Sequence, residues 1–121
     1  MRGTRPDGSE SGDRLRGFDF ARHNDEVSRL WKRGTAWNKP FRTPVIVGAN
    51  IRYFMYHPAA NPDRIGYRAF HEDPDVMFDT LLRFARWTRF NIPQDAPLGL
   101  PERWTITPDY ENYYEAAWFG C

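Results

Sequence analysis

The sequence predicts an α/β fold in which a helix joins two parallel strands. The first strand is predicted at residues 45–47, because a β-branched apolar run between Pro44 and Gly48 is typical of a strand buried on both faces. A long helix is predicted after Asp73, and a second strand follows at residues 104–107. A strand, a crossover helix and a second strand form a βαβ unit, whose right-handed crossover favours parallel pairing.

An amphipathic helix is predicted before the first strand. Asn24 or Asp25 can cap this helix, and apolar side chains follow at Val27, Leu30 and Trp31 with the spacing i, i+3 and i+4. We expect this helix to cover an apolar surface of the domain.

The long helix has the clearest start signals. Asp73 is its expected N-cap, Pro74 takes the first helical position, and Asp75 places a negative charge at the positive end of the helix dipole. Asn91 and Pro93 end the helix near residue 90. Its charged residues mark a solvent-facing side: Asp79, Arg83, Arg86 and Arg89.

The chain is long enough for one domain at most. Residues 1–17 hold four glycines and no aromatic residue, so they predict a disordered tail. Residues 94–103 contain three helix and strand breakers and predict a loop. Because two strands alone do not make a stable parallel sheet, we expect residues 18–121 to be the first part of a larger α/β domain.

Composition excludes several classes of protein. The net charge of +1 removes the electrostatic case for a nucleic-acid binder. No apolar run approaches the roughly 20 residues of a membrane span, and the N-terminus lacks the apolar stretch of a signal peptide. A single cysteine, Cys121, excludes an internal disulfide and favours a cytoplasmic location. The three histidines show no ligand spacing, so no metal site is predicted within the chain.

Large rings carry much of the apolar surface. Aromatic residues make up 17% of the chain, whereas the mean hydropathy is −0.75. Rings interspersed with charged residues suit a core, a ligand cleft or an interface, and composition alone does not choose among the three.

Candidate site residues follow the two predicted strands. Arg52 and Tyr53 come after the first strand, and Asp109 and Glu111 come after the second. Because loops converge at the carboxyl ends of parallel strands, an arginine and a carboxylate placed there could bind an anionic substrate and transfer a proton. A plain ion pair between two loops is the alternative interpretation.

Residues 44–53, 67–77, 81–84 and 106–109 together resemble the uroporphyrinogen decarboxylase family. The resemblance covers residues 40–121 and depends as much on the order of the predicted strands and helices as on the identities of single residues. The family fold is a TIM-type (β/α)₈ barrel, which typically needs about 250 residues. The resemblance therefore implies the N-terminal portion of such a barrel, with its first two parallel strands and their connecting helix.

The resemblance also implies roles for single residues. Arg52 would pair with substrate carboxylates, with Tyr53 as its neighbour, and Asp109 would stabilise a protonated intermediate without a cofactor. Glu111 is a weaker candidate for the same site. Residues 48–51 replace the first of two arginines of the family pattern, which argues against a tetrapyrrole substrate.

The expected function is thus that of a fragment, inactive alone, of a decarboxylase or a corrinoid-linked methyltransferase acting on a small anionic substrate. No cofactor is expected within this chain; the resemblance allows zinc or a corrinoid, and a homodimer, for a full-length methyltransferase parent. The alternative is a small aromatic-rich binding module without catalytic activity.

Overall fold

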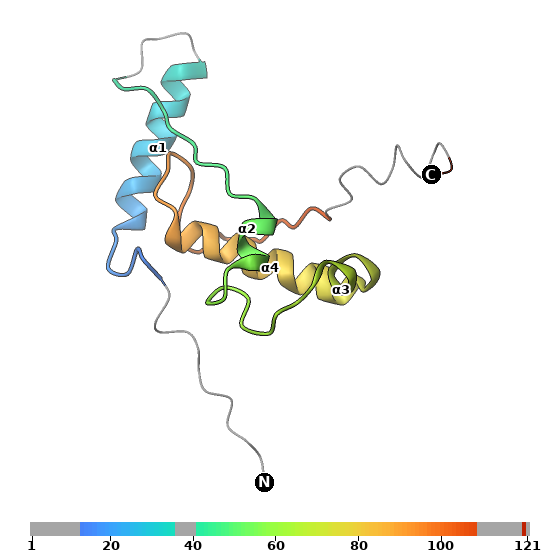
Figure 1. Cartoon of the computed structure of the whole chain (residues 1–121). Helices are drawn as coiled ribbons and strands as arrows, with labels where there is room; N and C mark the ends of the chain where they lie inside the picture. The colour runs from blue at the N-terminus through green and yellow to red at the C-terminus, as the bar shows by residue number, and fades with distance from the viewer. Residues whose placement is uncertain (1–12, 36–40, 109–119, 121) are drawn as a thin grey trace.

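The computed structural model describes residues 13–35, 41–108 and 120. In order along the chain, its helices are α1 (Phe20–Thr35), α2 (Ile51–Tyr56), α3 (Tyr67–Glu72) and α4 (Pro74–Asn91), as Figure 1 shows. The described residues contain helices and loops but no β-strand. The predicted α/β fold, with two parallel strands as part of a TIM-type barrel, is therefore wrong for this part of the chain.

Both predicted strands are extended or irregular segments instead. The backbone N–H of Val45 donates to the Asp95 carboxylate at 2.6 Å, and the N–H of Asp95 donates to the carbonyl oxygen of Val45 at 2.7 Å. Residues 45–47 stay 46–57% exposed, and residues 104–107 pair with no strand in the described part of the chain. A short apolar run signals extended backbone, but burial needs a neighbouring strand, and here a loop takes that place.

The segment after the first predicted strand, for which no helix was predicted, forms helix α2. Asn50 caps this helix, because its side-chain oxygen accepts the backbone N–H of Arg52 at 2.8 Å. Phe54 and Met55 are its buried residues. The Phe54 ring lies 5.6 Å from that of Phe84, which places α2 against α4.

The start signals of the long helix are confirmed. The Asp73 side chain accepts the backbone N–H groups of Asp75 at 2.9 Å and Val76 at 3.3 Å, and Pro74 is the first helical residue. Asp73 also ends α3, a helix that the sequence analysis did not predict, since its own N–H donates to the carbonyl oxygen of Ala69. Because Asp73 ends α3 and begins α4, the two helices follow each other directly and pack together. A small core of Phe70, Met55 and Met77 lies at this contact.

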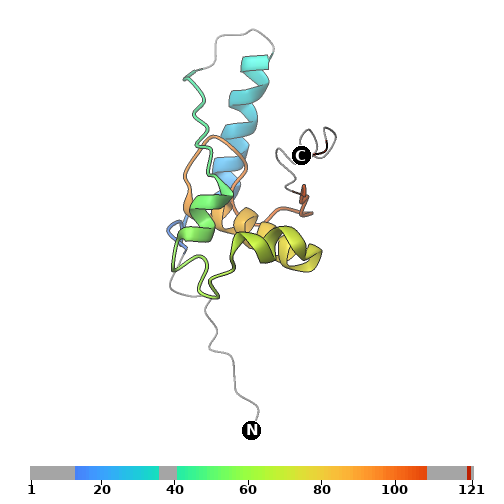
Figure 2. The same cartoon turned by 45° about the vertical axis from the view of Figure 1, so that its right-hand side comes forward.

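Helix α1 forms as predicted but begins earlier, at Phe20. Asp19 supplies the cap by accepting the N–H of Arg22 at 3.0 Å, and Val27 and Leu30 are buried. Asn24, one of the two expected caps, instead binds the backbone of Leu98 in both directions, at 2.8 and 3.1 Å. Figures 1 and 2 show the result: α1 stands across α4, and the loop after α4 (residues 92–101) runs beside it.

The residues before α1 contact the end of α4. The backbone N–H of Leu15 donates to the carbonyl oxygen of Phe90 at 3.1 Å, and that of Arg14 donates to the side chain of Asn91 at 3.0 Å. The predicted tail includes residues 1–12, which lie outside the residues that the structure describes. The division of the chain at residue 17 stays a prediction.

One buried polar group offers a test of this packing. Thr80 is 1% exposed, and its hydroxyl oxygen has no hydrogen-bond partner in the described structure. Thr80→Val should raise the free energy of unfolding by about 1 kcal/mol, because it removes a buried hydroxyl that gains nothing from folding. Urea denaturation measures the change.

Thr88→Val is the matched control, since the Thr88 hydroxyl donates to the carbonyl oxygen of Ala85 at 2.9 Å. That variant should lose stability where Thr80→Val gains it. A loss in both variants would contradict the described environment of Thr80.

Candidate functional site

A hollow lies between α2, α4 and the residues just before α1. Its volume is about 790 Å³, a size that suits a small molecule. Part of its lining is apolar: Val47, Phe54, Ala59, Ala60, Pro62, Ile92 and Pro93. The rest is aromatic or polar: Asp13, Arg14, Tyr53, His57, Arg83, Arg86, Trp87 and Asn91. Apolar walls with a few polar groups are the usual composition of a ligand site.

Three rings meet on one side of the hollow. The ring centroid of Tyr53 lies 5.7 Å from that of His57 and 6.0 Å from that of Trp87, and the last two rings are 6.4 Å apart. All three contacts are tilted, and Tyr53 is 58% exposed. A planar ligand group could therefore pack against these rings in the offset or edge geometry that aromatic pairs prefer.

Helix α4 brings two arginines to the same hollow. Arg83, Arg86 and Trp87 follow each other at i, i+3 and i+4, a spacing that places their side chains on one face of a helix. Because Arg86 and Trp87 lie one turn after Arg83, the hollow has cationic groups next to an aromatic ring.

Carboxylates already contact both arginines. Arg83 forms ion pairs with Asp79 at 3.1 Å and Asp63 at 3.4 Å, and Arg86 forms one with Asp13 at 3.2 Å. The carboxylates of Asp63 and Asp79 are 73% and 64% exposed. Such exposed pairs contribute little to stability, about 0 to 1 kcal/mol each, so an incoming anion can replace them at low cost.

His57 adds a polar atom to the aromatic side. It ends α2, where its backbone N–H donates to the carbonyl oxygen of Phe54 at 3.1 Å. Its side-chain Nδ1 is buried and has no hydrogen-bond partner among the described residues. A buried nitrogen without a partner is unfavourable for the fold, and its burial keeps a ligand in the hollow from reaching it.

Of the four site residues predicted from the sequence, the structure places one in the hollow. Tyr53 lies in the hollow, whereas Arg52 sits on α2 as an exposed residue outside the lining. Asp109 and Glu111 lie outside the residues that the structure describes. The strands whose ends were expected to bring Arg52 and Asp109 together do not form in residues 41–108, so their pairing stays a prediction without that physical basis.

Sequence reasoning placed Arg83 and Arg86 only on the solvent-facing side of the long helix and did not connect them with Trp87. The signal that could have found the site is their i, i+3, i+4 spacing, which joins the two groups of residues on one face. Another part of the wall comes from α2, a helix that was not predicted from the sequence.

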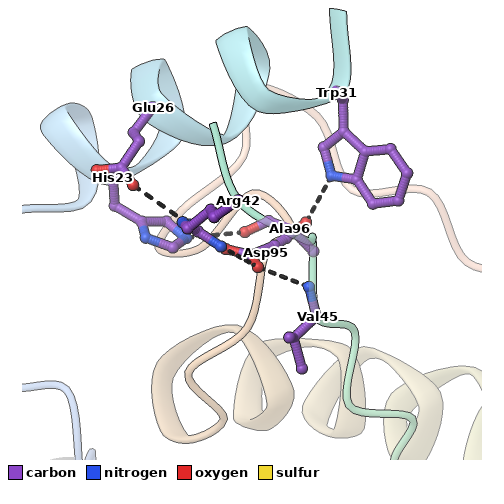
Figure 3. Close-up of polar contacts among 7 residues, drawn as sticks. All are labelled: His23, Glu26, Trp31, Arg42, Val45, Asp95 and Ala96. Atoms are coloured by element: carbon purple, nitrogen blue, oxygen red, sulfur yellow. Dashed lines mark hydrogen bonds and ion pairs between the residues drawn. The ribbon is translucent and has the colours of Figure 1, made fainter. Parts of the chain in front are cut away.

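A second polar cluster, shown in Figure 3, holds the loop after α4. The Asp95 carboxylate accepts one hydrogen bond from each terminal nitrogen of Arg42, both at 2.6 Å, and one from the backbone of Val45 at 2.6 Å. The Asp95 carbonyl oxygen accepts the indole N–H of Trp31 at 2.7 Å, and His23 contacts the carbonyl oxygen of Ala96 at 3.1 Å. We call this cluster the Asp95 clamp.

The charged groups of the Asp95 clamp are bonded to one another. The Arg42 hydrogen bonds hold the pKa of Asp95 below its ordinary value, although burial acts in the opposite direction. The same bonds, together with one to Glu26, raise the pKa of Arg42. The Asp95 clamp connects α1, the segment before α2 and the loop after α4. Because both oxygens of its carboxylate already accept hydrogen bonds, the hollow, and not the clamp, is the candidate ligand site.

Neither a membrane-spanning helix nor a metal-binding cluster is found among the residues that the structure describes. None of the helices that the structure describes is long and apolar enough to cross a membrane. Residues 13–35, 41–108 and 120 contain no group of three or more His, Cys, Asp or Glu side chains that could hold a metal ion. The zinc or corrinoid that the family resemblance allows for a longer parent stays a prediction.

No family model, no curated protein and no solved structure matches the chain. The geometry of the hollow is therefore the basis for a functional proposal.

Proposed function

We propose that the chain binds a small anionic molecule with a flat apolar part in the hollow between α2 and α4. The observation that carries this proposal is the shared face of α4, where Arg83 and Arg86 lie next to Trp87, whose ring centroid is 6.0 Å from that of Tyr53. Guanidinium groups bind carboxylates or phosphates, and the rings pack against the ligand body.

The charge balance of the hollow supports an anion. Among the residues that the structure describes, its lining contains three arginines, including Arg14, and one carboxylate, Asp13. Asp63 and Asp79 hold Arg83 by ion pairs but do not line the hollow. An anion would therefore meet chiefly Arg14 and Arg86.

This proposal matches the non-catalytic binding module among the two functions that the sequence predicts, and it keeps the small anionic ligand. Decarboxylation or methyl transfer by a longer parent stays a prediction from the family resemblance. Asp109, the carboxylate expected to stabilise the intermediate, lies outside the described residues, so no reaction step is derived.

Titration with 2-naphthoate, a flat carboxylate, tests the proposal. We expect saturable binding with a Kd on the order of 1 mM, because a ligand of about a dozen heavy atoms gains roughly 0.3 kcal/mol per atom. Calorimetry gives the affinity, and NMR shifts of the Trp87 indole and the Arg86 Nε–H locate the ligand. Absence of saturation, or shifts confined to other regions, would contradict the proposal.

Arg86→Gln should weaken 2-naphthoate binding about five- to tenfold, because a charge-assisted contact is lost. Arg68→Gln is the matched control, since Arg68 pairs with Glu72 on the exposed face of α3, away from the hollow. Equal affinities in the two variants would show that Arg86 does not bind the anion.

A further inference from the structure

We infer that Asp13 acts as an internal competitor in this hollow, so that a bound anion must displace its carboxylate from Arg86. The inference rests on the proposed function and adds a means of regulating the same site. Asp13 is the one carboxylate among the described lining residues, and it belongs to the segment that precedes α1.

The carboxylate of Asp13 occupies the position that a ligand carboxylate would take. Its two oxygens lie 3.2 and 3.4 Å from the two terminal nitrogens of Arg86, an end-on, two-bond contact of the kind that guanidinium groups make with carboxylate ligands. The Asp13 side chain is 25% exposed and that of Arg86 is 47% exposed. Solvent and a small ligand can therefore reach this ion pair.

The backbone around Asp13 is held by other bonds. Leu15 binds the carbonyl oxygen of Phe90 through its N–H at 3.1 Å, and the N–H of Arg14 binds the Asn91 side chain at 3.0 Å. Because these bonds do not involve the Asp13 carboxylate, that carboxylate can leave Arg86 while the segment stays on α4.

Arg86 is also held independently of Asp13. Its guanidinium carbon lies 4.8 Å from the ring centroid of Phe90, within the range of a cation–π contact. The guanidinium is thus already placed at the hollow when Asp13 departs, and a ligand does not have to order it.

Competition of this kind selects between anions. Acetate at Arg86 would replace the Asp13 carboxylate by its own. It would gain little binding free energy, since it is too small to contact the rings as well. A flat aromatic carboxylate also packs against Tyr53 and Trp87, and that contact offsets the loss of the Asp13 pair. The inference therefore assigns aromatic carboxylates, rather than simple carboxylates, as the ligand class.

Asp13→Asn tests the inference, because asparagine keeps the size and turn preference of aspartate but removes its charge. We expect 2-naphthoate to bind this variant about two- to fivefold more tightly than the wild type, the effect of an exposed ion pair that no longer has to be broken. The neutral analogue 2-naphthamide should bind both proteins equally. Circular dichroism checks that the variant keeps its helices.

Glu72→Gln is the control, because it makes the same change in net charge at an exposed site that does not line the hollow. Its affinity for 2-naphthoate should equal that of the wild type. Equal binding to wild type and Asp13→Asn, or an equal gain in Glu72→Gln, would overturn the inference and leave the proposed function standing. Absence of binding to every variant would overturn both.

Discussion

Asp95→Ala should lower the free energy of unfolding by about 3 kcal/mol, because it removes a buried carboxylate that accepts charge-assisted and backbone hydrogen bonds. The Asp95 side chain is 9% exposed, and its oxygens accept bonds from Arg42 and from the backbone of Val45. Without them, the backbone N–H of Val45 loses its acceptor and Arg42 loses both of its bonds to the loop after α4, while the bond from the backbone N–H at position 95 to the carbonyl oxygen of Val45 remains. Urea denaturation followed by circular dichroism measures the loss.

Glu26→Ala is the matched control for this prediction. Glu26 binds the same guanidinium at 3.2 Å, but its side chain is 41% exposed. An exposed pair contributes about 0 to 1 kcal/mol, so this variant should stay close to the wild type. Similar losses in the two variants would show that burial of Asp95 does not decide the strength of the clamp.

The contribution of Asp95 should depend on pH. Its pKa is lowered in the folded protein, chiefly by the Arg42 hydrogen bonds. A carboxyl group with a lowered pKa stabilises the fold fully above its unfolded pKa of about 4 and loses that contribution as the pH falls through its folded pKa. The stability gap between wild type and Asp95→Ala should therefore be constant near neutral pH and narrow below about pH 4.

The Asp95 clamp also shows which features the sequence could and could not predict. Helix α4 was predicted from Asp73, Pro74 and Asp75, which act on neighbouring backbone groups. The loop at residues 94–103 was also predicted, but its buried carboxylate was not. The partners of Asp95 lie 50 to 64 positions away along the chain, and no local pattern reports such a contact.

The predicted strand failed for a related reason. Residues 45–47 are extended, as the β-branched run indicates, but the backbone bonds of Val45 and Val47 go to Asp95 and Gln94. Whether an extended segment becomes a strand depends on what lies beside it. The same error affects the predicted site, because the expectation that Arg52 and Asp109 lie close together rested only on the ends of two parallel strands.

The site itself was predicted in part. Tyr53 was selected as a neighbour of Arg52 and lies in the hollow for a different reason, since α2 turns its ring toward His57 and Trp87. Arg83 and Arg86 were visible in the sequence as residues of one helix face, but their place in the hollow depends on α2, which forms part of its wall.

Gly99→Ala should destabilise the protein by about 2 to 4 kcal/mol, because two costs add at this position. Gly99 has a φ of +72°, a conformation that L residues rarely adopt. A Cβ atom at this position would lie 2.8 Å from the Phe20 ring, which packs edge-on against Phe90 with centroids 5.4 Å apart. The neighbouring bonds from Arg89 and Asn24 to the loop leave its backbone little freedom to move away.

Gly17→Ala separates the two costs. Gly17 has a φ of +79°, but a Cβ atom there would meet nothing within 4 Å. This variant should therefore lose only the backbone term of about 1 kcal/mol, and the difference between the two variants measures how tightly the loop after α4 packs on the start of α1. If both alanine variants lose the same free energy in urea denaturation, Gly99 is required for its backbone conformation alone, and the close packing of the loop against Phe20 is not a source of stability.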